Sequence, residues 1–401
     1  MDQAPQPLFN PQAADARVLG VLKPDLAELP TLLRSWSGPT PLRVASGATT
    51  SRAAADGCWC LDLRRQDSEV TWNAADATVR IGAACRIGDV LTCLVPHGRT
   101  IVAGLSGLPG LGYVLTGGIG PLSRRFGLAV DQLKSITGVW GNGDPFQLER
   151  SRHGGTAEWR GLCGAAPFLG VVTEVELFTQ ALEPLWVHQD RGAPQQLADW
   201  IEAAEQEEAG GSLQWHWGDD ASLMRLQVRS DPAPGHHRID GLHELPPLAS
   251  PPSVPPRLHG EVVGLLGPAA AGQWRRLIPD LEKLMALRPH PACSLSAQQL
   301  GGATARVHPQ HTSFIHRDAV WKPWITALWP AGDLDLRQRS LTWLDAVWQL
   351  LRPVCPGVHL AQLHDHLPFH QHELDLAFGV WLPELRELKR CKDPQGMLPP
   401  L

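Results

Sequence analysis

At 401 residues the chain exceeds what one hydrophobic core usually serves, so we expect two structural domains. Its 43% hydrophobic and 19% charged residues are typical of a globular protein and exclude a disordered or fibrous one. The formal net charge of −6 offers no basic footprint for nucleic acid, and no apolar window reaches the roughly 18–20 residues that span a bilayer. We therefore expect neither a nucleic-acid nor a membrane partner.

Residues 1–16 are an expected N-terminal tail, and they lack a basic segment followed by an apolar stretch. They do not predict a secretory signal. The eight cysteines are scattered, and without such a signal we expect reduced thiols, with Cys58 and Cys60 buried on one face of a strand. The cytoplasm is the expected location.

The pattern over residues 17–182 predicts a mixed α+β module. A short strand followed by an amphipathic helix is predicted within 17–36 from the spacing of the leucines. Alternating or β-branched runs predict further strands, and one apolar run that ends at His97-Gly98 predicts a helix. The strands are predicted at 42–45, 59–63, 78–85 and 168–179, and the helix at 87–98.

From residue 183 helical stretches alternate with extended ones, which predicts a second domain, a sheet with helices, over 183–375. Its helices are predicted at 193–208, 272–287 and 340–351, and its strands at 212–217, 223–229 and 259–266. Residues 230–257 are rich in Pro, Gly and His, so we expect a flexible surface loop or disordered insertion there. A last amphipathic helix is predicted at 382–390, ended by Asp393-Pro394.

The loop at 43–51 follows a predicted strand and consists mostly of small and hydroxyl residues. Small side chains let the backbone curl so that successive N–H groups point toward an anion, and Thr49, Thr50 and Ser51 add hydroxyl donors. These features suit a diphosphate. Taken alone, however, the segment fits an ordinary polar turn better.

A second loop, residues 104–120, is unusually dense in glycine, which costs about 0.5–1 kcal/mol per glycine in regular structure. Such a cost is expected where backbone closely approaches a ligand, and the alternative is a crossover between packed elements. The segment matches neither a phosphate-binding Walker loop nor a strict GxGxxG fingerprint. Because it contains no lysine, phosphate binding would rely on backbone N–H groups, which suits a dinucleotide better than a transferable triphosphate.

Four segments occur in an order that is specific to one family. They are YVLTGGIGPLSRRFGLAVDQL (113–133), GLCGAAPFLGVVTEVEL (161–177), SFIHRDAVW (313–321) and ELRELKRCKDPQGML (384–398). Together they resemble the flavoproteins with a vanillyl-alcohol-oxidase-type (PCMH-type) FAD domain, specifically the berberine-bridge-enzyme-like branch. The resemblance covers about 17–182 and resumes at about 311–398. Within it, SFIHRDAVW is similar to a strand of the substrate domain and ELRELKRCKDPQGML to the terminal helix.

The resemblance implies a two-domain α+β fold, in which an FAD domain at 17–182 is joined by the C-terminal segment 376–401. A central antiparallel sheet in the substrate domain would cover the flavin. The two loops would hold the pyrophosphate and flavin, an aspartate would help fix the second loop, and backbone groups near residue 171 would meet the flavin or adenine. The implied cofactor-binding residues are Ser46, Gly47, Ala48, Thr49, Thr50, Ser51, Thr116, Gly117, Gly118, Gly120, Ser123, Asp131, Gly170, Val171 and Val172.

The chain departs from the family pattern at the positions where many relatives tether FAD covalently. Thr49 stands where a tethering His would be, and Ser106-Gly107 stands where the tethering Cys would be. We therefore expect non-covalent FAD, with weaker support for oxidase-strength chemistry. The family's Tyr-x-Asn-Tyr-x-Asp base motif falls near 359–365, and both of its tyrosines are missing, so phenol-assisted alcohol oxidation is not supported.

His364 and His359 lie in that stretch and are the candidate catalytic residues. An imidazole with a pKa near 6.5 could take a substrate proton while hydride goes to the flavin. The alternative is that they are ordinary loop histidines. A metal site formed by His359, His364, His366, His370 and His372 with Asp365 is disfavoured, because no Cys shares the spacing, and we expect no metal.

Other residues have a structural and a functional interpretation. Arg124-Arg125 could clamp phosphate, but a pairing with an acid such as Asp131 is the better expectation. Trp215 and Trp217, and the pair His316-Arg317, could line a substrate pocket, although aromatic strand faces are more often core.

The leading hypothesis is an FAD-dependent dehydrogenase or oxidase that takes a hydride from a small organic, alcohol-like substrate and passes electrons to O2 or another acceptor. The alternative is a degenerate family member that binds flavin without turnover.

Overall fold

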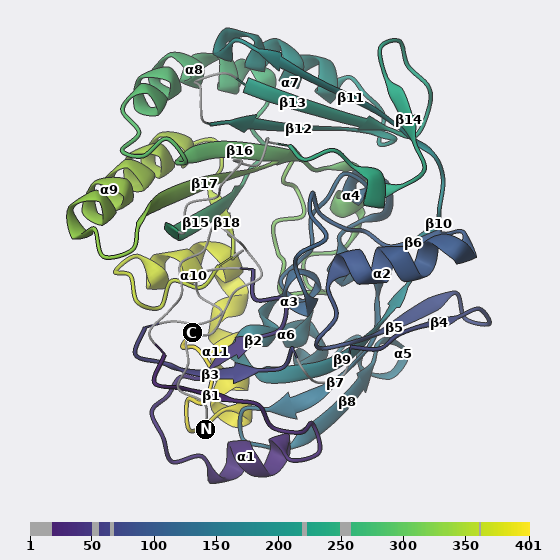
Figure 1. Cartoon of the computed structure of the whole chain (residues 1–401), viewed down its shortest axis with the longest axis vertical. Coiled ribbons are helices and arrows are strands. Elements are labelled where there is room, and N and C mark those ends of the chain that lie inside the picture. The colour runs from purple at the N-terminus through teal and green to yellow at the C-terminus, as the bar shows by residue number, and fades with distance from the viewer. Residues whose placement is uncertain (1–17, 50–55, 65–67, 219–222, 249–257, 361) are drawn as a thin grey trace.

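The computed structural model describes residues 18–49, 56–64, 68–218, 223–248, 258–360 and 362–401. It consists of two parts, which confirms the expected α+β class with a large antiparallel sheet (Figure 1). The N-terminal module carries β1 to β10 and α1 to α6 and is drawn in the lower half, except for α4, which lies beside the sheet module. The sheet module above it carries β11 to β18 and α7 to α9. None of the helices described is both long and apolar enough to cross a membrane.

The N-terminal module contains two main sheets. A parallel sheet has the order β1 (Gly20–Leu22), β3 (Trp59–Asp62), β2 (Arg43–Ala45). An antiparallel sheet has the order β4 (Val70–Asn73), β5 (Thr78–Gly82), β9 (Gly170–Phe178), β7 (Leu133–Trp140), β8 (Pro145–Glu149). A short pair joins β6 (Arg99–Thr100) to β10 (Gln180–Ala181). The helices are α1 (Leu29–Ser35), α2 (Ile87–Leu94), α3 (Leu111–Leu115), α4 (Ser123–Phe126), α5 (Arg150–His153) and α6 (Ala157–Ala165).

The sheet module is an eight-stranded antiparallel sheet with three helices, α7 (Leu197–Glu205), α8 (Ala271–Ala286) and α9 (Leu334–Leu351), on its outer side (Figure 1). Its opposite face is turned toward the N-terminal module. The strand order is β14 (His237–Ile239), β11 (Leu185–Gly192), β13 (Leu223–Arg229), β12 (Gly211–Trp217), β16 (Ser294–Gln299), β17 (Trp321–Pro330), β15 (Leu258–Leu266), β18 (Gly357–His359).

The spacing of apolar residues explains why the segments of the sheet module form helices that pack on the sheet. In α7 the buried residues Leu197, Trp200, Ile201 and Ala204 recur at helical spacing and give the helix one apolar face against the sheet. Tryptophans fill the layer between sheet and helices: Trp274 of α8 packs edge-to-face on Trp215 and Trp321, at centroid distances of 5.7 and 6.5 Å.

The C-terminal segment returns to the N-terminal module through α10 (His370–Phe378) and α11 (Leu382–Lys392). Leu42 N donates to Met397 O at 2.8 Å, and Asn142 N donates to Lys392 O at 2.7 Å. Lys389 Nζ reaches both Asp393 Oδ2 and Phe168 O. These bonds hold the chain's end beside β2 and β7.

Two expectations about the second domain are corrected. Within the expected flexible loop at 230–257, residues 230–248 include β14, which pairs with β11, and a 3-10 turn at Leu242–Glu244, while 249–257 lie outside the described residues. Of the three residues of β14 only Ile239 is buried, and the strand lies at the edge of the sheet beside β11. In SFIHRDAVW, residues 313–320 run as loop and turn, and the strand begins only at Trp321.

Candidate active site

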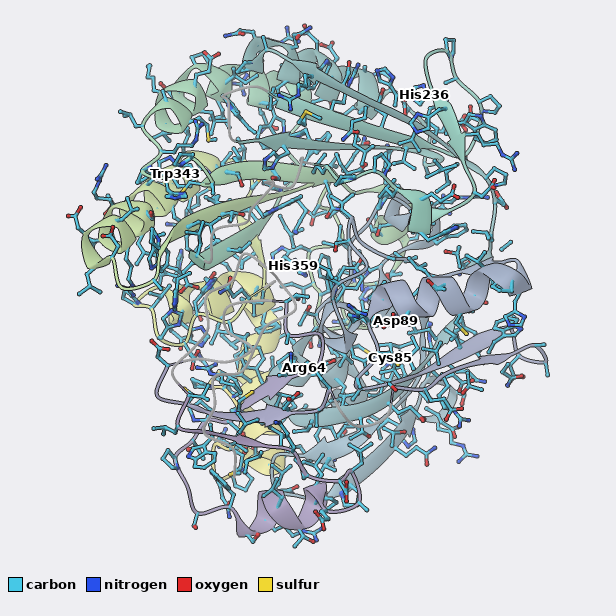
Figure 2. All side chains as sticks on the ribbon, viewed as in Figure 1. Arg64, Cys85, Asp89, His236, Trp343 and His359 are labelled. Carbon is cyan, nitrogen blue, oxygen red and sulfur yellow. The ribbon has the colours of Figure 1, made fainter. Side chains whose placement is uncertain are left out.

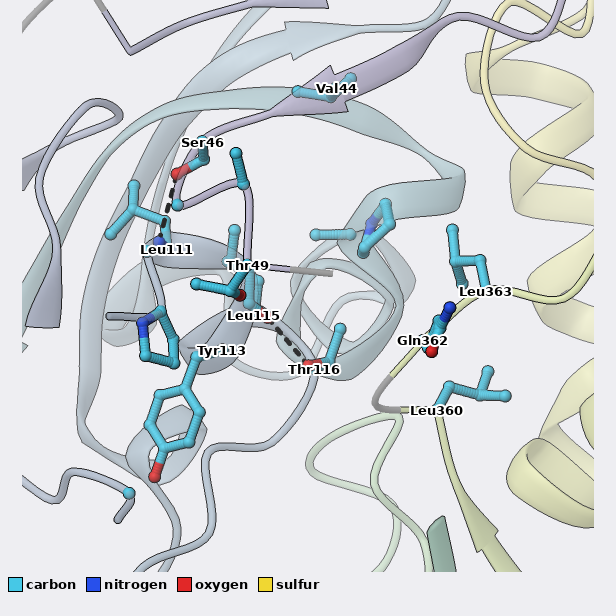
Figure 3. A pocket seen from close by; sticks show the side chains of 18 of the residues that line it. Val44, Ser46, Thr49, Leu111, Tyr113, Leu115, Thr116, Leu360, Gln362 and Leu363 are labelled. Atoms are coloured by element: carbon cyan, nitrogen blue, oxygen red, sulfur yellow. Dashed lines mark hydrogen bonds between the residues drawn. The ribbon is translucent and has the colours of Figure 1, made fainter. Parts of the chain in front are cut away.

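A cavity of about 460 Å³ lies between the two modules, within the roughly 300–1,000 Å³ of small-molecule sites. One wall consists of the loops before and after α3, together with the loop after β2. The other wall consists of residues from the facing ends of β16, β17 and β18 and from the loop after β18. Figure 3 shows Thr49 and Thr116 on the first side and Gln362 and Leu363 on the second.

The two loops touch each other through their backbones. A Cβ added at Gly47 would lie 2.1 Å from Gly110 N, and one added at Gly110 would lie 2.4 Å from Gly47 N. Ser46 locks the contact, because its Oγ donates to Ala83 O at 2.7 Å and accepts from Leu111 N at 3.3 Å (Figure 3). The glycines are thus needed so that two chain segments can approach each other, and the cavity lies beside that contact.

A second layer of the glycine-rich segment holds the first in place. A Cβ at Gly120 would lie 1.7 Å from Ala103 O, and Ser123 Oγ accepts from Gly120 N at 3.0 Å. Gly117 and Gly118 have φ values of 138° and 73°, and their carbonyls accept hydrogen bonds from the backbone N–H groups of residues 130 and 129. This layer positions Thr116, which does line the cavity.

Asp131 is the buried anchor of the second layer. It accepts two hydrogen bonds, each 2.8 Å, from the Arg317 guanidinium, and a third from Leu128 N at 2.9 Å. The expected pairing of Asp131 with Arg124 or Arg125 is wrong. Arg124 instead donates to Glu207 O and Gly211 O of the sheet module, and Arg125 pairs with Glu183. Arg317 occupies both carboxylate oxygens of Asp131 through two guanidinium nitrogens.

The structure divides the expected cofactor residues into two groups. On the cavity wall are Ser46, Gly47, Ala48, Thr49, Thr116, Gly170 and Val172. Behind the wall are Gly117, Gly118, Gly120, Ser123, Asp131 and Val171. Thr50 and Ser51 lie outside the described residues.

The expectation that His364 serves as a catalytic base is not supported by its position. The side chain is 1% exposed and is absent from the cavity wall. Its Nδ1 lies 2.7 Å from Glu373 Oε2 of α10, and its Nε2 lies 3.5 Å from Glu261 Oε2 of β15. His364 therefore ties the segment after β18 to two neighbouring elements. No metal-binding group of three or more ligands exists among the described residues.

His359 does reach the cavity, near the middle of the molecule (Figure 2). Its Nε2 lies 3.0 Å from Thr116 O, and since a carbonyl can only accept, Nε2 carries the hydrogen. Nδ1 is therefore left as an acceptor, and it is buried with no hydrogen-bond partner among the described residues. Burial, and then the nearby Lys322 charge, lower the pKa of His359 to about 3, so the ring stays neutral at physiological pH.

Three wall residues of the sheet module were missed by sequence reasoning: Gln298 of β16 and Lys322 and Trp324 of β17. A lysine inside the otherwise apolar and aromatic run VWKPWITALW was the signal that could have identified the site. Trp215 and Trp217, by contrast, are core residues, and Arg317 is engaged by Asp131. His316 also makes a structural contact, since its Nε2 lies 2.7 Å from Leu376 O.

The charge on the wall is unbalanced. The described wall contains no aspartate or glutamate, and its charged residues are Arg43 and Lys322. Arg43 is paired with Asp365, its Nη2 lying 2.6 Å from Oδ2. Tyr113, the chain's only tyrosine, has a buried hydroxyl with no hydrogen-bond partner among the described residues, and burial raises its pKa.

These features fit FAD. A Cβ added at Gly112 would meet nothing within 4 Å, so a ligand can approach the backbone there. Tyr113 Oη and His359 Nδ1 are buried polar atoms of wall residues that lack a partner among the described residues. A ligand that is large, flat and bordered by hydrogen-bonding atoms would satisfy them.

Comparisons with known proteins agree with this interpretation. Residues 35–149 match the model of an FAD binding domain family. The FAD-dependent monooxygenase FUP4 of Fusarium proliferatum is 34% identical over 119 residues, which is 29% of this chain and 23% of that protein. (R)-6-hydroxynicotine oxidase of Paenarthrobacter nicotinovorans is 34% identical over 126 residues, 31% and 27% of the two chains. The match thus spans about a quarter of the length of these relatives.

Two solved structures show the same fold over nearly the whole chain. Chitooligosaccharide oxidase superposes with a TM-score of 0.79 at 17% identity, covering 97% of this chain and 92% of that one. Berberine bridge enzyme from Eschscholzia californica superposes with a TM-score of 0.76 at 15% identity, covering 95% and 90%. Residues 35–149 thus match an FAD binding domain family, and the chain has the fold of chitooligosaccharide oxidase and berberine bridge enzyme.

Proposed function

We propose that the protein binds one FAD non-covalently in the cavity and acts as a dehydrogenase or oxidase on a small organic substrate. The observation that carries the proposal is the cavity itself, which has backbone-rich loops of an FAD binding domain on one wall and polar side chains of a sheet on the other. Relatives that match about 30% of this chain include an FAD-dependent monooxygenase and an oxidase, which supports redox chemistry here.

The loop residues Ser46 to Thr49 and the backbone of Gly112 to Thr116 would hold the cofactor, with Gly170 and Val172 on a neighbouring part of the wall. Bound FAD would supply a two-electron acceptor for a hydride from the substrate. The chain's part is to orient both molecules and to exclude water with the apolar side chains of Leu63, Leu115 and Ile119 and others on the wall.

Non-covalent attachment is supported by the chemistry of the wall. The described wall contains no cysteine, and its one histidine is His359, whose Nε2 is held by Thr116 O. Thr49 and Ser106 both line the cavity and offer only hydroxyls. They stand where many berberine-bridge-like flavoproteins carry the residues that tether FAD.

His359 contributes as a neutral hydrogen-bond acceptor. A ring with a pKa of about 3 cannot hold a substrate proton at neutral pH, so the role of general base expected for it is replaced by orientation through Nδ1. A binding role without turnover is the second candidate function, favoured by the lack of any carboxylate on the described wall that could serve as a base.

The visible absorption spectrum of the purified protein, before and after acid precipitation, tests the proposal. We expect flavin bands in the native protein and free FAD in the supernatant. Flavin that stays in the pellet would contradict non-covalent attachment, and a colourless protein that cannot be reconstituted with FAD would refute flavin binding. Anaerobic bleaching by candidate alcohols, amines and hydroxy acids separates turnover from binding alone.

A further inference from the structure

Lys322 is a buried cation on the wall of the cavity. It lies on β17, is 8% exposed and belongs to the cavity wall. Its stem passes β15, since a Cβ added at Gly264 would lie 3.6 Å from Lys322 Cε. Its Nζ lies 4.3 Å from the centroid of the Trp324 ring, two residues along the same strand face.

No carboxylate among the described residues pairs with this ammonium, and the described wall carries none. The other titratable wall residues are His359, which is neutral, Tyr113, whose buried hydroxyl stays protonated, and Arg43, which is already paired with Asp365. A buried charge without a partner costs several kcal/mol, as an order of magnitude, and such groups cluster at functional sites. The cost is explained if a ligand supplies the missing negative charge.

A second donor faces the cavity directly beside Lys322. Gln298 of β16 is its cross-strand partner in the antiparallel register, which brings the two Cβ atoms to roughly 4.5–5.5 Å. Gln298 is 4% exposed, and its Nε2 is buried without a hydrogen-bond partner among the described residues. An ammonium and an amide N–H₂ on adjacent strands match the two oxygens of one carboxylate.

We propose that Lys322 and Gln298 form a carboxylate-binding subsite, so that the substrate of the proposed oxidoreductase is a small organic acid. The inference rests on the proposed function, and it names the substrate class of the same cavity. The carboxylate is bound and not oxidised, while the face of Trp324 packs against the apolar part of the molecule. The phosphates of FAD are a different source of negative charge, but the loops proposed to bind them form the opposite wall.

Benzoate and its neutral isostere benzamide are the probes. Each is titrated into the FAD-loaded protein, with binding followed by the flavin absorbance and by calorimetry. We expect benzoate to bind at least tenfold more tightly than benzamide. Lys322→Met should weaken benzoate at least tenfold and leave benzamide unchanged, Lys322→Arg should restore most of the affinity, and the exposed control Lys283→Met should change nothing.

Equal affinities for benzoate and benzamide, or unchanged benzoate binding in Lys322→Met, would overturn the subsite. Loss of FAD from Lys322→Met with benzoate affinity unchanged in the reconstituted protein would assign the lysine to the cofactor and also overturn it, while the proposed function stands. If the protein binds no FAD, the proposed function fails, and the calorimetric titration still decides whether Lys322 and Gln298 recognise a carboxylate.

Discussion

Replacing Lys322 by methionine should stabilise the protein, because the substitution removes a buried ammonium and keeps a side chain of similar length. Burial lowers the pKa of Lys322 from 10.5 to about 8. Since each pKa unit corresponds to about 1.36 kcal/mol, holding the charged form in the folded state costs about 3 kcal/mol at pH 7. The contact with Trp324 returns roughly 0.5–1 kcal/mol, which leaves a net gain of about 2 kcal/mol for Lys322→Met.

The gain should depend on pH with a defined sign. Below pH 8 the lysine is charged in both the folded and the unfolded chain, so the wild type carries the full cost. Between pH 8 and 10.5 the folded protein releases the proton while the unfolded chain keeps it, so wild-type stability rises relative to the variant. The advantage of Lys322→Met should therefore shrink by about 2 kcal/mol between pH 7 and pH 9.5.

Urea unfolding at pH 7 and pH 9.5, in buffer free of carboxylates, measures both effects. His359, the nearest titratable neighbour, stays neutral when folded across this range in both proteins, so it does not obscure the difference. The exposed Lys283→Met serves as the matched control and should show no comparable pH dependence between the two conditions. A variant less stable than wild type at pH 7, or a gain that is the same at both pH values, would refute the reasoning.

Gly47→Val should abolish FAD occupancy, because its Cβ would lie 2.1 Å from a backbone nitrogen of the facing loop. The control Gly155→Ala, with no atom within 4 Å of the new Cβ, should keep the flavin absorbance. Unchanged flavin absorbance in Gly47→Val, or its loss in Gly155→Ala, would show that FAD binding does not depend on the contact between the two loops. Asp131→Asn should lower the free energy of unfolding by about 3–5 kcal/mol, because it leaves a buried guanidinium without its partner. Asp199→Asn at an exposed pair should cost less than about 1 kcal/mol in the same urea experiment, and similar losses in the two variants would contradict the burial argument. His359→Gln should change the turnover rate but not the shape of its pH profile between pH 5 and 8, since the pKa of the wild-type ring is about 3. If the wild-type profile has an inflection near pH 6.5 that the variant lacks, the histidine is a base after all.

Much of the secondary structure follows from local sequence. The extended stretch predicted at 223–229 is β13 with these bounds, and the helix predicted at 272–287 is α8 within one residue at each end. The glycine density of 104–120 predicted a backbone that closely approaches a ligand or another element, because a lack of side chains is itself a local property. For these elements the deciding pattern lies within a few residues along the chain, whereas the backbone that the loop approaches at Gly47 belongs to a distant segment.

The composition of the cavity, in contrast, was decided by contacts between distant segments. Two histidines five residues apart lie in different environments. His359 is the last residue of β18 and lines the cavity, whereas His364 is bonded to Glu373 of α10, a helix that only the folded chain brings near. Arg317 pairs with Asp131, which lies 186 residues away in the sequence, and no spacing rule predicts such a pair.

The sequence alone therefore determined the α+β fold class and the positions of the two loops rich in small residues, because those depend on local pattern and on a family resemblance. Only the tertiary structure placed Gln298 opposite Lys322, since the register of two paired strands is set by the packing of the whole sheet. The same packing left that lysine without a described carboxylate partner and facing the cavity, and it is the basis for assigning a substrate class.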